Sequence, residues 1–374
     1  MSWKSVVGQQ QAKDILRQAL LSGRVAHAYL FSGPEGSGTE PLAIEFARAL
    51  VCPEGHGEAC DRCGSCRAAA AGFGSPNIHC ITQLPAGKGE KSGDPPLAKL
   101  SEEDLAAVRE QLALKAADPY ATLQIPRATT IKVNSIREIR REVSLTGFGS
   151  GRKVFLILGA DAMNDEASNA LLKTLEEPPA ETVLLLTAEH PQQLLPTIVS
   201  RCQHLRLGPV AAADIAAALL VRGASDKEAH AVAGLAEGSY TRALRLLDSG
   251  YTEQRDDCIA FLRSAVRGIP GDLHRQIEEW AGGYDRAELG DRLRTLQVWL
   301  REAMHMQNTA GGPAGREDQA LSRFVERYRS VSYNDVDRAL ERAISLLDKN
   351  VYIPLILLTL AASLRRSIDT QPQR

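Results

Sequence analysis

Residues 28–40 read Ala-Tyr-Leu-Phe-Ser-Gly-Pro-Glu-Gly-Ser-Gly-Thr-Glu, and they are the most informative stretch of the chain. The first four residues are apolar and lead into Ser32-Gly33-Pro34, which is how a buried strand that ends in a tight loop reads. A helix is predicted to follow over residues 41–51, with Pro41 in its first turn. A strand, a glycine-rich loop and a helix therefore follow one another, as they do around a phosphate-binding loop.

This loop keeps the glycines of the phosphate-binding pattern but lacks its two reactive residues. The pattern is G-x-x-x-x-G-K-[ST], whereas this chain has Thr39 in place of the lysine and Glu40 in place of the hydroxyl residue. The lysine pairs with the terminal phosphates and the hydroxyl binds magnesium, so a carboxylate there would repel a triphosphate. The glycines are Gly33, Gly36 and Gly38. Taken alone, the stretch is equally compatible with a simple tight turn.

A second apolar strand, predicted over residues 154–158, lacks the acids of a nucleotide-hydrolysing site. Such a strand should end in carboxylates that hold magnesium and polarise water. This one ends in Leu158-Gly159, and the next acid, Asp161, lies three residues past the expected first position. The phosphate loop and this strand thus both match an ATPase site in sequence pattern, but both lack the side chains that bind the phosphates and magnesium. The pattern predicts an ATPase fold that does not hydrolyse ATP and is not expected to bind it, although the residues alone leave weak binding open.

Strand-like and helical patterns alternate in the first half of the chain, and only helical patterns follow. The alternation predicts a parallel α/β sheet flanked by helices. The predicted strands are 28–31, 154–158 and 182–187, and the predicted helices are 10–22, 41–51, 134–144, 164–177 and 194–200.

These patterns divide the chain into three predicted domains. They are an α/β core over residues 1–207, a small helical unit over 208–250 and an all-α domain over 251–374. A proline- and glycine-rich insertion with flexible flanks is predicted over 82–130, with one helix at 101–117 inside it. The role of this insertion is open from the sequence.

Four clustered cysteines predict a metal site. Cys52, Cys60, Cys63 and Cys66 form the pattern C-x7-C-x2-C-x2-C. A tetrahedral Zn²⁺ needs four soft ligands in one small loop, and C-x2-C pairs supply them. In a reducing compartment such a cluster more often binds a metal than forms disulfides. We therefore predict a structural zinc site; unligated thiols, or disulfides in an exported protein, are the alternatives.

The composition is that of an ordinary globular protein. The chain has 374 residues, a formal net charge of −2, 44% hydrophobic and 24% charged residues. These values argue against intrinsic disorder and against a protein that coats nucleic acid through a strongly basic charge. The longest apolar run, residues 351–364, is shorter than the roughly 20 residues of a membrane span. The N-terminus has no apolar signal region, so we expect a cytoplasmic protein without membrane contact.

Five stretches along the chain together resemble the clamp-loader branch of the AAA+ proteins. In chain order they are Val7-Gly8-Gln9, residues 27–36, the four-cysteine loop, residues 169–179 (Asn-Ala-Leu-Leu-Lys-Thr-Leu-Glu-Glu-Pro-Pro) and Ser200-Arg201-Cys202. The resemblance is strong over residues 5–80 and 131–207 and weaker beyond. It implies an α/β AAA+ core, a small helical lid and an all-α C-terminal collar through which subunits join in a ring.

Departures from the family pattern indicate which kind of member this chain is. The motor subunit of that branch keeps the lysine and the acids, so Thr39 and Leu158-Gly159 favour a non-hydrolysing member. The family's sensor strand carries a small polar residue near its end, which here falls on Ala188 or Glu189, with Thr187 one step early. We therefore do not expect this chain to sense a terminal phosphate of its own.

One catalytic element of the family is retained in the sequence. Arg201 matches the family's arginine finger, which points at the triphosphate of a neighbouring subunit and neutralises charge in the transition state. For an isolated arginine, a surface salt bridge would be the alternative. Arg242 lies near the family's second sensor position and is equally compatible with a plain surface charge.

The resemblance also implies partners. They would be gamma/tau-type motor subunits, a clamp-opening delta subunit and, through the assembled ring, a sliding clamp and primed DNA. The chain itself would be a non-catalytic subunit in DNA replication. Two alternatives remain: an active gamma/tau-type ATPase, against which the altered loop argues, and a zinc-dependent DNA-binding module on an inactive core. Glu54, Glu58 and Asp61 argue against the second, since with Arg62 and Arg67 they leave no basic stripe.

Overall fold

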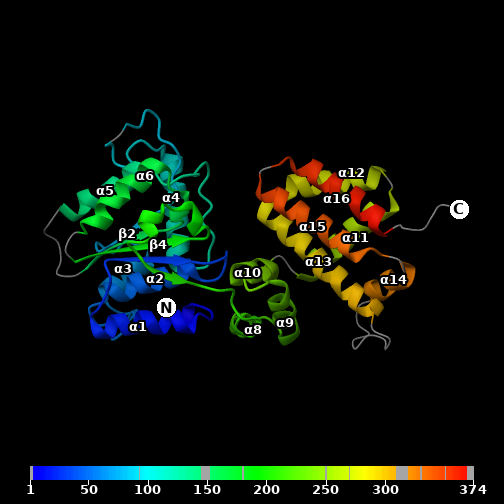
Figure 1. Ribbon diagram of the computed structural model, residues 1–374, viewed down its shortest axis with the longest axis horizontal. Coiled ribbons are helices and arrows are strands. Elements are labelled where there is room, and N and C mark those ends of the chain that lie inside the picture. Colours follow the sequence, from blue (N-terminus) through cyan, green and yellow to red (C-terminus); the bar gives the residue numbers. More distant parts are fainter. Residues whose placement is uncertain are drawn as a thin grey trace. The chain divides into compact units, whose positions relative to one another are not determined.

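Five parallel strands form one sheet in the N-terminal half, in the spatial order β2-β3-β4-β1-β5 (Figure 1). The computed structural model describes residues 3–91, 93–144, 152–178, 181–248, 251–268, 270–308, 319–328, 331–349 and 351–368. The strands are β1 Ala28–Ser32, β2 Ile78–Ile81, β3 Lys153–Ile157, β4 Thr182–Ala188 and β5 Gln203–Arg206. The predicted parallel α/β sheet is confirmed. The edge strands β2 and β5 were not predicted because each has only four residues and contains polar ones.

The central strands are buried on both faces because successive side chains enter two different apolar layers. On one face, Phe31 of β1 packs with Phe46 of α2 and with the apolar side of α1. On the other face, Leu30 packs with α5 and α6 through Ile139 and Leu171. The helices of this part are α1 Gln10–Ser22, α2 Thr39–Leu50, α3 Gly64–Ala70, α4 Glu102–Ala117, α5 Val133–Ser144, α6 Asp165–Glu176 and α7 Pro196–Val199.

Capping residues set where two of these helices begin. The Asn164 side chain accepts a hydrogen bond from Ala167 N at 2.9 Å and starts α6. The Ser101 hydroxyl accepts one from Asp104 N at 3.2 Å and starts α4. Both helices agree with the predicted ranges to within a residue. α6 ends before Pro178; Pro179, the second proline of the predicted stop, lies outside the described residues.

Described residues of the 82–130 insertion contact the core near both ends; the flexible flanks expected from its glycines and prolines remain a prediction. Leu84 and Thr130, near its two ends, form an antiparallel bridge. Glu90 pairs with Lys132 at 2.6 Å and accepts a hydrogen bond from the Asn134 side chain. The physical reason is that these polar groups are largely buried, where leaving them without partners would be costly.

Three further helices complete the first of two compact units, Met1–Ala243. They are α8 Ala212–Val221, α9 Asp226–Leu235 and α10 Tyr240–Asp248, whose residues from Leu244 onward belong to the second unit. We call α8, α9 and the start of α10 the lid. The Val210 N–H donates to the Gly238 carbonyl at 2.9 Å, which joins the segment before α8 to the turn before α10.

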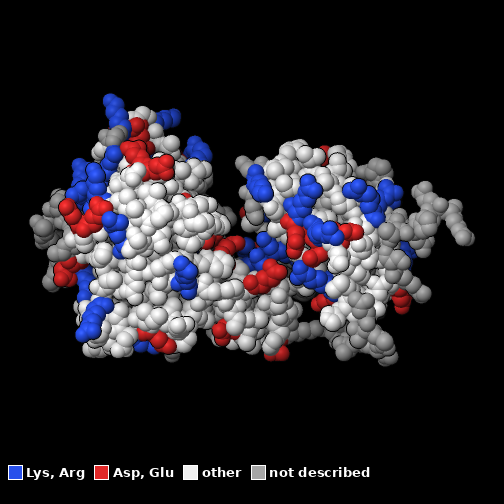
Figure 2. Space-filling model, in the orientation of Figure 1, with Lys and Arg blue, Asp and Glu red and all other residues white. Residues whose placement is uncertain are grey.

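On the face shown in Figure 2, acidic and basic side chains are interspersed among wide uncharged areas.

The second unit, Leu244–Arg374, contains helices and no strand within its described residues. Its apolar core contains stacked Phe261 and Trp280 rings 4.7 Å apart, and Arg292 lies over the Tyr284 ring at 3.6 Å. Its helices are α11 Tyr251–Arg267, α12 Pro270–Gly283, α13 Arg286–Asn308, α14 Gln319–Arg327, α15 Tyr333–Asp348 and α16 Ile353–Ile368. Within the described residues, no helix is both long and apolar enough to cross a membrane.

Candidate functional site

The loop segment 33–40 runs from the end of β1 into the first turn of α2. Gly36 and Gly38 have φ angles of 71° and 95°, which glycine adopts without steric cost. A Cβ at Gly36 would collide with the Ser239 hydroxyl. The Gly36 carbonyl accepts a hydrogen bond from Tyr240 N at 3.0 Å. The loop is therefore packed directly against the lid, at the start of α10.

Glu40 is paired with Lys115 from the insertion. The Lys115 side chain is only 2% exposed; its ammonium forms an ion pair with the Glu40 carboxylate and donates to the Ala121 carbonyl at 2.7 Å. Thr39, the residue in the lysine position of the pattern, is buried as the first residue of α2. A positive charge thus does reach the start of α2, but it comes from α4 and meets a carboxylate of the same chain.

Tyr120 lies beside this pair and is 5% exposed. Its hydroxyl accepts a hydrogen bond from Val7 N at 2.8 Å, and a Cβ at Gly38 would lie 3.2 Å from the same oxygen. Its ring meets the Tyr240 ring edge-on at 4.7 Å. Burial raises the pKa of Tyr120, so the phenol is neutral at physiological pH. The side chain joins the N-terminal segment, the loop and the lid.

Carboxylates gather around the loop. Desolvation by the surrounding protein, together with the negative charges of Glu35, Glu40 and Asp161, raises the pKa of Glu189 to about 7. Part of the Glu189 residue is nevertheless exposed, and water there screens these charges. Negative charge therefore gathers at the end of β4, and the ammonium of Lys115 offsets part of it.

Glu189→Gln should remove part of the pH dependence of stability. The folded state raises the pKa of Glu189 from about 4.5 to about 7, so its favourable contribution is complete below pH 4.5 and is lost as the pH rises through 7. At pH 8 the variant should be more stable than the wild type by less than about 1 kcal/mol, because the group is partly solvated. Thermal unfolding at pH 5 and pH 8 measures this difference. Glu110→Gln, on the exposed side of α4, is the control, and an identical pH response of the Glu189→Gln variant and the wild type would contradict the assignment.

The two residues that follow β3, Leu158 and Gly159, carry no carboxylate. Leu158 is buried, and Gly159 N donates to the Thr187 hydroxyl at 2.9 Å, which joins the ends of β3 and β4. Asp161 accepts hydrogen bonds from the backbone N–H groups of Glu189 and His190 at 3.1 and 2.8 Å. Asp161 and Thr187 thus fix the loops that follow the two strands.

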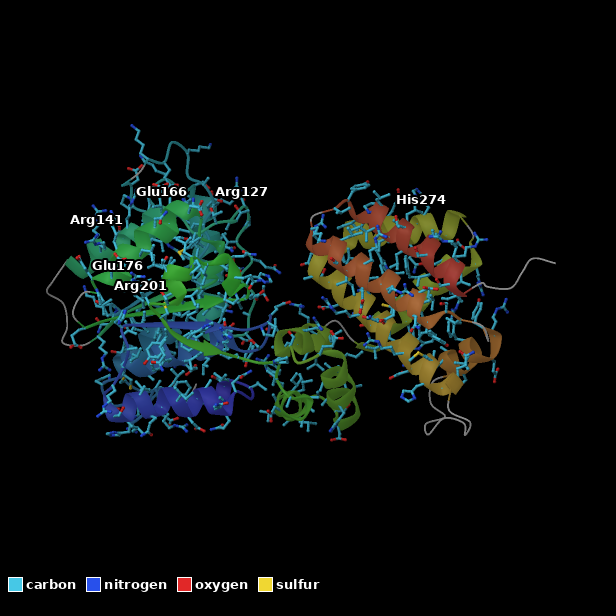
Figure 3. All side chains as sticks on the ribbon, in the orientation of Figure 1. Arg127, Arg141, Glu166, Glu176, Arg201 and His274 are labelled. Atoms are coloured by element: carbon cyan, nitrogen blue, oxygen red, sulfur yellow. The ribbon has the colours of Figure 1, made fainter. Side chains whose placement is uncertain are left out.

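Arg201 is on the surface, between α7 and β5. Its guanidinium donates to Glu176 at 2.9 Å and to the Thr197 carbonyl at 3.1 Å. The two side chains of the pair are 36% and 49% exposed, and Figure 3 shows them close together. In the isolated chain Arg201 therefore forms a surface salt bridge, the alternative considered above, with a glutamate of the 169–179 stretch.

Arg242 lies within the lid, where its side chain is mostly buried. It pairs with Glu237 at 2.9 Å and approaches the Ala236 carbonyl at 3.4 Å. These contacts connect the start of α10 with the end of α9, so a structural role accounts for its position.

The four clustered cysteines meet in space. Their sulfur atoms all lie within 4.8 Å of one another, and Cys60 Sγ is 4.0 Å from Cys66 Sγ. The N–H groups of Cys60, Cys63 and Cys66 donate to the preceding cluster sulfurs, Cys52, Cys60 and Cys63, at 3.3–3.4 Å. Such bonds stabilise thiolates, and four thiolates that converge in this way fit a tetrahedral metal ion.

The loop that carries these cysteines is attached to the core at two points. Arg48 of α2 binds the buried Glu45 at 2.8 Å and reaches Asp61 in the loop at 2.5 Å. Trp3 Nε1 donates to the Gly57 carbonyl at 2.7 Å. The remaining cysteines, Cys80, Cys202 and Cys258, are separate, and burial raises the pKa of each to about 12.

Comparison with known proteins identifies the family. Residues 8–211, more than half of the chain, match the family model described as DNA polymerase III, delta subunit. The chain belongs to this family. The resemblance to the clamp-loader branch is thereby confirmed, and the parallel sheet, the helical C-terminal half and the cysteine cluster are those expected of it.

Individual relatives agree with the DNA polymerase III delta subunit family. DNA polymerase III subunit delta' of Bacillus subtilis is 30% identical over 56% of this chain and 51% of the relative. That of Pseudomonas aeruginosa is 34% identical over 69% and 65%, respectively. DNA polymerase III subunit tau of B. subtilis is 25% identical over 93% and 57%. The chain therefore covers about half to two thirds of the length of these relatives.

One solved structure is also similar in part. A DNA polymerase III gamma subunit-related protein from Thermotoga maritima aligns over 95% of this chain and 99% of its own, with 15% identity and a TM-score of 0.45.

Sequence reasoning missed Lys115 and Tyr120. No motif contains them, and their partners Glu40 and Val7 lie 75 and 113 residues away in the chain. The available signal was Glu40 itself, because a carboxylate next to buried residues at a helix start requires a partner or solvent.

Proposed function

We propose that this chain is a non-hydrolysing, delta'-type subunit of a bacterial sliding-clamp loader. The observation that carries the proposal is the ion pair between Glu40 and Lys115 at the start of α2. The charge that a phosphate loop would offer to a nucleotide is neutralised within the chain. The missing acids after β3 and the carboxylates around Glu189 support the same conclusion, since hydrolysis needs magnesium ligands and a site that tolerates a triphosphate.

The proposal gives Arg201 a role in a neighbouring subunit. An exposed arginine–glutamate pair is worth about 0–1 kcal/mol, so a triphosphate can displace Glu176 at little cost. Arginine suits this task because it stays charged and binds phosphate through two donors. Its position on the surface, between α7 and β5, supports a contact made outside its own chain.

The four cysteines are proposed to bind one structural Zn²⁺. Zinc accepts four thiolates in tetrahedral geometry and has no redox chemistry, which suits a site that holds a loop. Cys52, Cys60, Cys63 and Cys66 would hold the ion, which would supply cross-linking of the 52–66 loop and no reaction step. The attachment of the loop to α2 through Arg48 and Asp61 supports a structural role.

The remaining parts of the proposal concern assembly. We propose that residues 1–207 form the AAA+-like core, 208–250 the lid and 251–374 the collar that joins the ring. Gamma/tau-type motor subunits and a delta subunit would be the direct partners, and the clamp and primed DNA would be reached through the complex. The names of the relatives, all DNA polymerase III subunits, support these partners and a place in the cytoplasmic replisome.

ATP hydrolysis by the chain alone and in the reconstituted complex tests the proposal. The purified chain should hydrolyse no ATP above background, and its addition to motor and delta subunits with clamp and primed DNA should stimulate their activity. Hydrolysis by the chain alone would favour the active gamma/tau-type alternative. DNA binding by the chain alone that depends on bound zinc would favour the zinc-dependent DNA-binding module instead.

A further inference from the structure

The room beside the phosphate loop is occupied by a segment of the insertion. Loops of this kind receive phosphates on the backbone N–H groups at the start of the following helix. Here the start of α2 is covered by Lys115, at the end of α4, and by Tyr120, in the turn that follows. Both side chains are almost completely buried. We call residues 115–121 the plug segment.

Lys115 reproduces inside the chain a contact that normally involves a nucleotide. In a functional loop, a lysine from the loop binds the terminal phosphates. In this chain the lysine comes from α4, and the anion it binds is the carboxylate of Glu40. The bond from Lys115 to the Ala121 carbonyl also fixes the turn that carries Tyr120. The Lys115–Glu40 ion pair and the Tyr120 side chain are thus coupled through this turn.

Tyr120 fills the space between the loop, the N-terminal segment and the lid. Its hydroxyl is bound by Val7 N and lies against Gly38, and its ring contacts Tyr240. The side chain of Tyr120 therefore fills the space between the loop, the N-terminal backbone and the lid with protein atoms.

The plug segment is also fastened to the lid. Asp118 accepts a hydrogen bond from Arg222, at the end of α8, at 3.1 Å, and binds the backbone N–H of Tyr120 at 3.0 Å. The Arg222 guanidinium in turn lies 5.9 Å from the centre of the Tyr240 ring. These contacts hold the lid to the core through groups of the chain itself.

We propose that Lys115 and Tyr120 act as an internal plug that excludes nucleoside di- and triphosphates and keeps the lid fixed on the core. The inference does not rest on the clamp-loader role, because it concerns only contacts within this unit. It assigns a role to the 82–130 insertion and separates two reasons for the loss of nucleotide binding: altered loop residues and physical occupation of the site.

Restoration of the loop chemistry with and without the plug tests the proposal. A background variant T39K/E40T/K115M returns the lysine and hydroxyl to the loop and avoids an unpaired buried Lys115. With Tyr120 in place, this variant should not bind the fluorescent nucleotide mant-ADP with Mg²⁺. Adding Tyr120→Ala should increase the affinity for mant-ADP at least about 30-fold, because the tyrosine ring no longer disfavours the conformation that can bind nucleotide. Tyr120→Phe, which keeps the ring, is the matched control and should remain without binding.

Two results would overturn the plug. One is binding of mant-ADP by the background variant as tight as by its Tyr120→Ala derivative. The other is measured by amide hydrogen exchange on Tyr120→Phe in the otherwise wild-type chain. This measurement tests the plug even if the Tyr120→Ala variant does not fold. Tyr120→Phe removes the acceptor of Val7 N–H, so exchange in residues 6–9 should accelerate; unchanged exchange would mean that Tyr120 does not hold this segment in solution. ATP hydrolysis in the complex is measured separately, so failure of the plug and failure of the proposed function remain distinguishable.

Discussion

Arg201→Ala should eliminate ATP hydrolysis at one site of the reconstituted clamp loader and leave this chain's own fold intact. An arginine finger contributes roughly 10³-fold or more to the rate of phosphoryl transfer at the site it enters. Since one copy of this chain would reach one neighbouring nucleotide, the loss should concern a single site. The removed contacts are an exposed pair with Glu176 and one carbonyl bond, so the free energy of unfolding should change by about 0.5 kcal/mol or less.

Rapid-quench measurement of a single round of hydrolysis resolves this effect better than steady-state rates. With Arg201→Ala, the amount of product formed in the burst should fall by the amount that one active site contributes, whereas ATP binding stays unchanged. Arg201→Lys should behave in nearly the same way, because an ammonium lacks the two-donor fork.

Arg137→Ala is a matched control for this experiment. Arg137 also pairs with a glutamate, Glu166, at 2.9 Å, and it has a similar exposed fraction of 43%. Arg137 and Arg201 pair with different helix residues at separate places on the first unit; Glu166, Glu176 and Arg201 are labelled in Figure 3. A full burst with Arg201→Ala, or an equal loss with Arg137→Ala, would remove Arg201 from the proposed role.

The features that could be predicted from the sequence are those that depend on short segments. β1 and β3 each contain an uninterrupted apolar run, residues 28–31 and 154–157. Gly36 and Gly38 of the loop have a positive φ that few other residues accept. The cysteine cluster follows from ligand spacing within fifteen residues, and its sulfurs do converge. In each of these cases the residue types that the local sequence pattern favours are also those that the folded structure needs at the same positions.

The features that could not be predicted depend on contacts between distant segments. The insertion has a composition typical of a loose excursion, yet its Lys115 and Tyr120 are among the best-buried polar residues near the loop. Nothing in the neighbouring residues of either indicates Glu40 or Val7 as a partner. Arg201 is a case of a different kind, because its salt bridge with Glu176 is a property of the single chain and its proposed role requires a second one.

Removal of the zinc proposed for the cysteine cluster should produce a large loss of stability in the first unit. A ligand that binds only the folded state stabilises it by about 4 kcal/mol when its free concentration is a thousand times its dissociation constant. Structural zinc sites bind at least this strongly. For a unit of this size such a loss lowers the midpoint of thermal unfolding by roughly 10 °C. Cys60→Ser, which deletes one ligand at a partly exposed position, should have this effect together with loss of bound zinc.

The metal content and the reactivity of the thiols decide this prediction even if the Cys60→Ser variant does not fold. The wild type should contain one zinc per chain, and chelation should make four additional thiols reactive while the midpoint falls. Cys202→Ser is the matched control, because Cys202 has the same intermediate exposure but lies outside the cluster; it should keep its zinc. Retention of one zinc by Cys60→Ser, or its absence from the wild type, would be incompatible with a four-thiolate site. Because Arg48 and Trp3 attach this loop to the core, loss of the metal should also loosen the N-terminal segment, which hydrogen exchange in residues 3–9 would detect.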